Sequence, residues 1–333
     1  MTKGATVATQ AAIAVATLAL GCLVGYRAGE SRRDAITPQV LRQNASDYHF
    51  INPIIVFTIG DKENFPEYKP LESKVASYVQ AAAAKGDASS VSLYFRDLSD
   101  ESWTGISEND KYAPSSMLKV AVLIAYLKLS ESDPGLLERR IQYSPQVDPG
   151  QTFKPTHSLA PGLRTVEEVL QSMIDESDNS SVQSLINAQK EAVMGVYADL
   201  GLPVPKDPTD IDFMSARLYS RLFRALYNGT YLSKALSEKA LEILSKTDFD
   251  QGIVAGLPAH VQASHKFGER TIYETSTGKV LERQLHDCGI VYAPAAPYFV
   301  CVMTKGSDFS KLQAVISDIS KIVYQSASSK AQK

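Results

Sequence analysis

Residues 111–129, with the sequence KYAPSSMLKVAVLIAYLKL, form a long apolar run that is interrupted early by a lysine. Pro114 and Ser115 are typical of a helix start, and the run from Ser116 onward is apolar on almost every face. A helix that is apolar all round is buried, so we predict a central helix here. Lys119 lies three residues after Ser116, on the same helix face, and is predicted to be buried with it.

A buried lysine beside a serine is a chemically useful pair. Burial lowers the pKa of the Lys119 amine, and a neutral amine can take the proton of the Ser116 hydroxyl. A helix N-terminus also favours developing negative charge. Three simpler interpretations remain open: Ser115 or Ser116 only caps the helix, Lys119 reaches the surface along its stem, or the S-x-x-K spacing arises by chance. Ser276 and Lys279 form a second copy of that spacing in a predicted turn.

Two further motifs follow in order along the chain. Ser177-Asp178-Asn179 lies between two helical runs, and Lys266-Phe267-Gly268 lies on a predicted strand. The succession of S-x-x-K, S-D-N and a K-T-G-like triplet resembles the class A branch of the β-lactamase and penicillin-binding protein superfamily. The resemblance extends from about Leu71 to Tyr324.

The resemblance implies a role for each motif residue. Ser116 looks like the nucleophile that opens a β-lactam ring or attacks a peptide carbonyl, and Lys119 looks like its general base or part of a proton relay. Ser177 would pass a proton to the leaving nitrogen. Asn179 would hold substrate and tether Lys119. Lys266 would supply positive charge for a substrate carboxylate and poise Ser177.

The strand after Lys266 is expected to complete the substrate site. The resemblance implies substrate contacts from Phe267, Gly268 and Glu269, and an oxyanion hole made by the backbone N–H groups of Ser116 and Glu269. For Asp178 we favour a purely structural role as a helix N-cap.

The chain departs from the family pattern at the third motif. Phe267 stands where the family has Thr or Ser, which removes a hydroxyl that would bind a substrate carboxylate. Glu269 adds a negative charge at the same place, and His265 precedes the motif. Glu269 could pair with Lys266, lie at the surface or act on water. These changes weaken the expectation of a standard carboxylate ligand.

The segment after S-D-N also departs from the pattern. No E-x-x-L-N occurs between Asn179 and Lys266, and that glutamate activates the deacylating water in class A enzymes. Asp207, Asp210 and Asp212 are the carboxylates of the candidate region, and we interpret them as surface residues. We therefore expect acylation with slow deacylation. The alternative is a non-catalytic sensor or scaffold that binds β-lactams or peptidoglycan.

The order of elements predicts an α+β fold of three layers, like that of β-lactamases and transpeptidases. Residues 71–86 and 308–325 read as amphipathic helices, and residues 89–107 read as a hairpin. Strands return after residue 260. We predict one antiparallel sheet flanked by the N- and C-terminal helices, with an all-helical lobe over about residues 111–259.

The amino terminus has the composition of a membrane-spanning segment. Residues 5–26 carry no charge and would span about 33 Å as a helix. A membrane anchor, a cleaved secretory signal and a lipoprotein signal that would lipidate Cys22 all remain open. We expect an anchor or signal over residues 1–27, a linker over 28–66 and a membrane-anchored, extracytoplasmic hydrolase domain over 67–333. Arginines just after the span argue for the opposite orientation.

Charge and cysteine usage exclude other classes. A net charge of −3 provides no basic surface for nucleic acid. No H-E-x-x-H or C-x-x-C motif is present, so we expect no metal and no cofactor. We also expect a monomer. Cys288 and Cys301 could form a disulfide or remain as two buried thiols, because the sequence does not determine strand register.

Overall fold

The computed structural model describes residues 40–42, 48–57, 65–146, 148, 150–205, 207 and 209–330. The described residues from Val40 to Val56 and from Phe65 onward form one compact unit. The predicted membrane segment, residues 5–26, lies outside the described residues. No helix within the described ranges is both long enough and apolar enough to cross a membrane.

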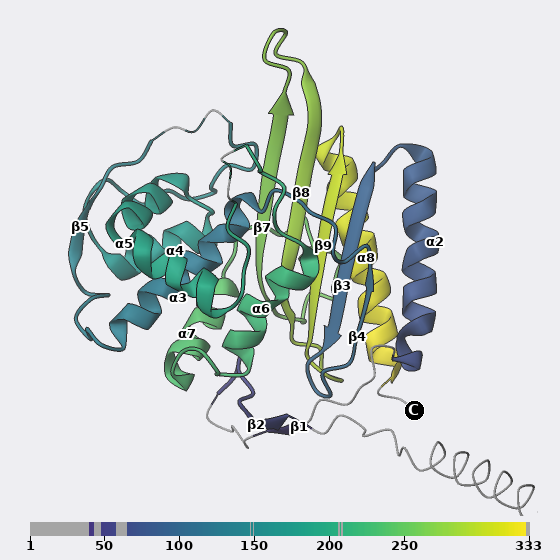
Figure 1. Ribbon diagram of the computed structural model, residues 1–333, viewed down its shortest axis with the longest axis horizontal. Helices are drawn as coiled ribbons and strands as arrows, with labels where there is room; N and C mark the ends of the chain where they lie inside the picture. The colour runs from purple at the N-terminus through teal and green to yellow at the C-terminus, as the bar shows by residue number, and fades with distance from the viewer. Residues whose placement is uncertain are drawn as a thin grey trace, which may run out of the picture. The chain divides into compact units, whose positions relative to one another are not determined.

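A five-stranded antiparallel sheet forms the centre of the unit (Figure 1). Its strand order is β4-β3-β9-β8-β7, so both ends of the chain contribute to one sheet, as predicted. The predicted hairpin forms its first two strands. The strands are β3 (Ser90–Asp97), β4 (Trp103–Ile106), β7 (Ala263–Tyr273), β8 (Val280–Val291) and β9 (Tyr298–Gly306).

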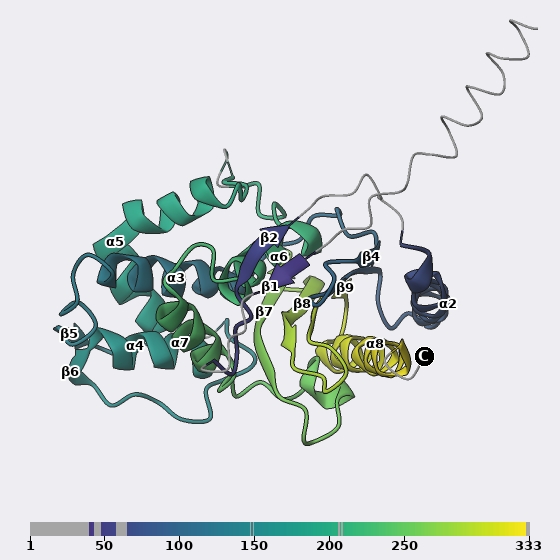
Figure 2. The same ribbon diagram turned by 90° about the horizontal axis from the view of Figure 1, so that it is seen from below.

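Two helices cover one face of this sheet. Helix α2 (Lys69–Lys85) and helix α8 (Phe309–Lys330) pack together on the side away from the helical lobe (Figures 1 and 2). Helix α2 ends where Gly86 adopts a φ of 70°, a left-handed conformation that glycine reaches without steric cost. The predicted amphipathic helices at the two ends of the domain are thus confirmed.

The other face of the sheet carries the helical lobe. Its helices are α3 (Lys119–Ser130), α4 (Val166–Asp175), α5 (Asn179–Asp199), α6 (Ala216–Tyr227) and α7 (Lys234–Leu244). A short strand pair, β5 (Arg140–Tyr143) and β6 (Gly162–Thr165), also lies in the lobe, so the predicted all-helical lobe is corrected in this detail. A short 3-10 turn, Val254–Gly256 (η3), packs against α8.

Helix α3 is the buried axis of the lobe, as its sequence predicts. Every residue from Lys119 to Leu127 is buried, and α3 packs against α4, α5 and α7. Because apolar side chains surround it, any polar group that α3 carries must find its partners within the protein.

Part of the predicted linker, residues 28–66, is folded onto the domain. Strands β1 (Val40–Arg42) and β2 (Ile54–Phe57) pair with each other, and a 3-10 turn, Pro66–Tyr68, leads into α2. The carboxylate of Glu238 accepts hydrogen bonds from the backbone N–H groups of residues 49–51. Arg42 forms an ion pair with Glu101. These polar contacts, most of them partly buried, hold a segment that we predicted to be a linker.

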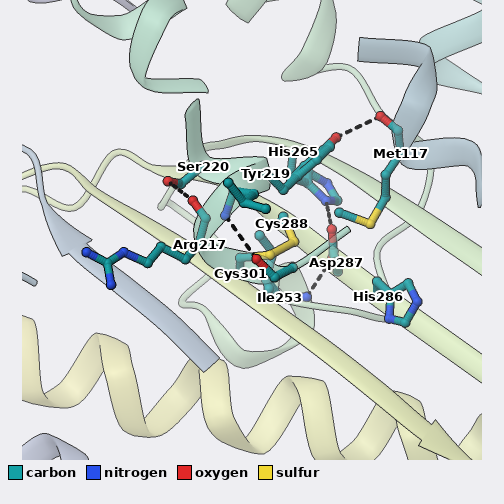
Figure 3. The surroundings of a disulfide bond; sticks show 12 residues. Met117, Arg217, Tyr219, Ser220, Ile253, His265, His286, Asp287, Cys288 and Cys301 are labelled. Carbon is teal, nitrogen blue, oxygen red and sulfur yellow. Dashed lines mark hydrogen bonds and ion pairs between the residues drawn. A yellow bond between two sulfur atoms is a disulfide. The ribbon is translucent and has the colours of Figure 1, made fainter. Parts of the chain in front are cut away.

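The two strand cysteines form a disulfide beneath the lobe. Cys288 and Cys301 are directly opposite each other on β8 and β9, and both are fully buried. Figure 3 shows the bond surrounded by Met117, Tyr219 and His265. Strand register, which sequence did not provide, therefore decides between the two interpretations in favour of the disulfide.

Gly268 allows the edge strand β7 to approach the segment that carries Ser116. A Cβ atom at this position would lie 2.6 Å from the carbonyl oxygen of Pro114 and 2.9 Å from Cγ of Met117. We predict that Gly268→Ala lowers the free energy of unfolding by about 1–3 kcal/mol, because either the strand or the serine segment must move. Urea unfolding of the full chain measures this. Gly135→Ala, where a Cβ meets nothing within 4 Å, is the control, and equal effects of the two changes would contradict the prediction.

Candidate active site

The predicted nucleophile lies in a tight turn that precedes α3. Ser115–Leu118 form a 3-10 turn (η2), so the α-helix begins at Lys119, three residues later than predicted. The Tyr219 hydroxyl donates to the Met117 carbonyl oxygen at 2.9 Å, which fixes the turn from α6. The Ser116 side chain is half-buried. The turn therefore presents Ser116 at the junction of sheet and lobe.

Strand β8 binds both backbone polar groups of Ala113, two residues before this turn. Gln284 accepts a hydrogen bond from the Ala113 N–H at 3.0 Å, and His286 Nε2 lies 3.1 Å from the Ala113 carbonyl oxygen. Burial lowers the pKa of His286 to about 3, so its ring is neutral. Its Nδ1 accepts from the backbone N–H of Thr304, so Nε2 carries the hydrogen and donates to Ala113.

Lys119 is buried, as predicted, and its amine is held by the S-D-N segment. Nζ donates to the Ser177 carbonyl oxygen at 2.6 Å, to Ser177 Oγ at 3.2 Å and to Asn179 Oδ1 at 2.7 Å. Burial lowers its pKa to about 7, although the charges of Asp178, Asp148 and Glu269 oppose the shift. A substantial neutral fraction therefore exists at neutral pH, as a general base requires.

The S-D-N segment joins α4 to α5 through a constrained turn. Ser177 adopts a φ of 55°, a left-handed conformation that is uncommon for a residue with a side chain. Asp178 caps α5, as predicted, by accepting from the backbone N–H groups of Ser180 and Ser181, and it accepts from the Tyr143 hydroxyl at 2.9 Å. The cap aims Ser177 and Asn179 at Lys119.

Lys266 lies deeper than the predicted role suggests. It is fully buried, and among the described residues its Nζ has no hydrogen-bond partner. Nζ lies 4.2 Å from the centroid of the Phe267 ring. Burial and the nearby charge of Lys119 lower its pKa well below the usual value for lysine, although Asp287 and Asp175 oppose this. Its role toward a substrate carboxylate stays a prediction.

Phe267 and Glu269, on the same strand as Lys266, contact other segments of the chain. Phe267 is 4% exposed and stacks on Phe249 with ring centroids 4.1 Å apart. Glu269 accepts hydrogen bonds from the backbone N–H groups of Thr152 and Phe153 at 2.9 and 2.8 Å. Three roles were left open for Glu269. The structure shows a different one, because its carboxylate binds a loop of the helical lobe. Their predicted roles in substrate binding are untested.

The carboxylates that follow S-D-N do not bind the central lysine. Asp207 accepts from the Thr209 backbone within its own loop. Asp212 forms an ion pair with Lys305 and accepts from Gln284. Asp210 is exposed. The described carboxylates that act electrostatically on Lys119 come from elsewhere in the chain.

Sequence reasoning missed two residues of the loop between β5 and β6. Asp148 accepts from Asn179 Nδ2 at 2.6 Å, and Gln151 Nε2 donates to the Ser177 carbonyl oxygen at 3.4 Å. No motif marks either residue. The only signal was the density of turn-forming residues at 144–155, which indicates a loop and nothing of where the loop packs.

A cavity of about 480 Å³ lies next to this loop. Its walls include Phe153, Asp175, Glu176, Asp248 and Phe267. Burial raises the pKa values of Asp175 and Glu176 to about 7, with smaller contributions from neighbouring carboxylates. In the described part of the chain, no group of three or more His, Cys, Asp or Glu side chains is arranged to hold a metal ion.

Comparison with known proteins agrees with this architecture. The sequence pattern of the beta-lactamase enzyme family matches residues 72–327. No curated protein sequence matches the chain.

Solved structures share the fold at low identity. PBP-A is 20% identical, with a TM-score of 0.64 over 78% of this chain and 97% of its own. A PBP-A mutant solved as an acyl-enzyme complex with penicillin G is 19% identical, with a TM-score of 0.63 over 78% and 97%. A beta-lactamase from Chitinophaga pinensis is 21% identical, with a TM-score of 0.64 over 76% and 99%.

The cap of α5 is the structural support of the site. We predict that Asp178→Ala lowers the free energy of unfolding by about 2–4 kcal/mol, because it removes a helix cap and leaves the buried Tyr143 hydroxyl without its acceptor. Asp207→Ala, which removes an exposed aspartate that also binds a backbone N–H, should change it by no more than about 0.5 kcal/mol. Denaturant unfolding of both variants measures the difference, and a loss below about 1 kcal/mol for Asp178→Ala would contradict the prediction.

Proposed function

The chain belongs to the beta-lactamase enzyme family, and from this premise we propose that it is a serine hydrolase that forms an acyl-enzyme on Ser116. The acyl donor is a β-lactam or a cell-wall peptide. The observation that carries the proposal is Lys119: a buried amine with a pKa near 7, held by Ser177 and Asn179, three residues after a half-buried serine.

Acylation would begin with the neutral amine. Lys119 takes the proton from the Ser116 hydroxyl while Oγ bonds to the carbonyl carbon of the donor. The C–N bond then breaks, Ser177 gives its hydroxyl proton to the leaving nitrogen, and Ser177 regains a proton from Lys119, whose Nζ lies 3.2 Å from Ser177 Oγ. The backbone N–H groups of Ser116 and Glu269 stabilise the negative oxygen between these steps.

Deacylation would be slow. In class A enzymes a glutamate after S-D-N activates the hydrolytic water, and no such glutamate occurs here. Asp207 and Asp212 bind groups elsewhere, and the Glu269 carboxylate binds loop amides. We therefore expect behaviour closer to a penicillin-binding protein than to a rapid β-lactamase.

We further propose that the hydrolase domain is extracytoplasmic and attached to a membrane through residues 5–26. The Cys288–Cys301 disulfide supports an oxidising compartment, because such bonds are rare in the cytoplasm.

A sensor or scaffold without turnover is the second candidate. Phe267 is packed into an aromatic cluster, and Lys266 Nζ is fully buried, so the strand offers a weaker site for a substrate carboxylate than the family pattern implies. Both candidates share the fold, and covalent labelling separates them.

The central test is the intact mass of the full chain after incubation with penicillin, with free antibiotic followed in parallel. We expect a stable adduct of one penicillin per chain and slow antibiotic consumption. Ser116→Ala should abolish the adduct, whereas Ser115→Ala, in the adjacent serine, should retain it. An adduct that persists in Ser116→Ala would refute the assigned nucleophile. Absence of any adduct with β-lactam and peptide donors would favour the binding protein.

The pH dependence of acylation tests the role of Lys119. Because the neutral amine is the base, the acylation rate constant should rise about tenfold per pH unit below the Lys119 pKa and level off above about pH 8. Lys119→Met should lower it by at least about 100-fold at pH 8. Stopped-flow labelling between pH 5 and 9 provides the measurement, and a flat profile in the parent chain would rule out this base.

A further inference from the structure

One segment of the helical lobe crosses to the edge strand of the sheet beside the predicted nucleophile. It consists of residues 150–156 together with Asp148, and we call it the strap. It belongs to the connection between β5 and β6, both of which lie in the lobe. Its contacts nevertheless reach β7, so it spans the two parts of the protein that contribute the motif residues.

On the lobe side, the strap lies directly beside the catalytic groups. Gln151 Nε2 donates to the Ser177 carbonyl oxygen, the same atom that accepts the shortest hydrogen bond of Lys119. Asp148 accepts from Asn179 Nδ2 at 2.6 Å. The Asn179 side chain is therefore engaged at both ends, with Oδ1 bound to Lys119 and Nδ2 bound to the strap.

On the sheet side, Glu269 holds the strap by its backbone. One carboxylate oxygen accepts from two consecutive amides, those of Thr152 and Phe153, at 2.9 and 2.8 Å. Hydrogen bonds to an ionised acceptor are among the stronger ones in proteins. Glu269 is half-buried, so water competes weakly for it. This carboxylate thus acts as a latch.

An aromatic contact reinforces the latch. The Phe153 ring packs edge-to-face against three rings of the domain core, with centroids 5.2 Å from Phe249, 5.9 Å from Phe267 and 5.4 Å from Phe309. Edge-to-face packing at these distances is favourable. The phenylalanine that replaces a hydroxyl residue in the third motif is therefore part of the strap's docking site.

The strap uses groups that an acyl donor would need. A donor bound between the S-D-N turn and β7 finds one of the two N–H groups of Asn179 Nδ2 already bound to Asp148. It must also fit beside Gln151, which contacts the same carbonyl as Lys119. A large donor therefore requires the strap to leave, whereas a small one does not.

We propose that the strap closes the cleft over Ser116 and selects acyl donors by size, and that Glu269 is the specificity-determining residue that latches it. The selection of acyl donors rests on the proposed function. The closure itself concerns only access to position 116.

Access can be measured without acyl transfer. In the full chain carrying Cys22→Ser, the substitution Ser116→Cys introduces the only free thiol, because Cys288 and Cys301 are disulfide-bonded. We would measure its reaction rates with a small reagent, iodoacetamide, and with a bulky fluorescent maleimide. Glu269→Ala should raise the maleimide rate by about tenfold, and should raise the iodoacetamide rate much less, because only the bulky reagent needs the open state.

Two further variants keep the test decisive. Asp148→Ala releases the other end of the strap and should act in the same direction. Glu191→Ala removes an exposed glutamate of α5 and should change neither rate. The proposal is wrong if the maleimide rate is unchanged in both strap variants, or if both reagents accelerate equally, which would indicate general loosening of the fold.

Penicillin labelling of the same strap variants with Ser116 intact separates the two proposals. Faster labelling than in the parent chain would support both. Faster maleimide reaction with no labelling in any variant would leave the strap supported and count against the hydrolase. Unchanged maleimide rates with normal labelling would support the hydrolase and count against the strap.

Discussion

The enclosure of the Lys119 amine is the constraint on which the site depends. An unpaired ammonium in a protein interior costs several kcal/mol, so the chain must supply either partners or a lowered pKa, and it supplies both. Ser177 and Asn179 provide the acceptors, and burial lowers the pKa to about 7. The S-D-N turn, its aspartate cap and the unusual backbone of Ser177 all follow from bringing acceptors to a helix that is otherwise surrounded by apolar side chains.

A second buried lysine, Lys266, interacts electrostatically with Lys119. The charge of Lys119 adds to burial in lowering the pKa of Lys266. Among the described residues, Lys266 Nζ has no hydrogen-bond partner. Two positive charges in one site repel, so protonation of one amine disfavours protonation of the other. This coupling favours a neutral amine in the site at neutral pH, which general-base catalysis needs. It also reduces the positive charge available for a substrate carboxylate.

The departures from the family pattern form one structural unit. From the sequence, Phe267 and Glu269 indicate a weakened substrate site, because they remove a hydroxyl and add a negative charge where a substrate carboxylate would bind. In the structure, Phe267 packs against Phe153, and Glu269 binds the amides of Thr152 and Phe153. The same two residues thus dock a loop that also contacts Ser177 and Asn179. The proposed selection of acyl donors by size explains both substitutions together. Independent loss of the motif residues would not explain why Phe267 and Glu269 both contact the strap.

The sequence alone determined the fold class, the order of the three motifs and the burial of Lys119, because these depend on apolar periodicity and on local spacing. It also identified Asp178 as a cap, since capping involves residues that are neighbours in the chain. It did not determine the Cys288–Cys301 disulfide, which depends on the register of β8 against β9, or the partners of Glu269. Asp148 and Gln151 carry no motif, and they reach the site only because the loop between β5 and β6 folds back onto β7. Contacts between segments distant in the chain are decided by tertiary packing, because no local pattern of side chains encodes where a loop comes to rest.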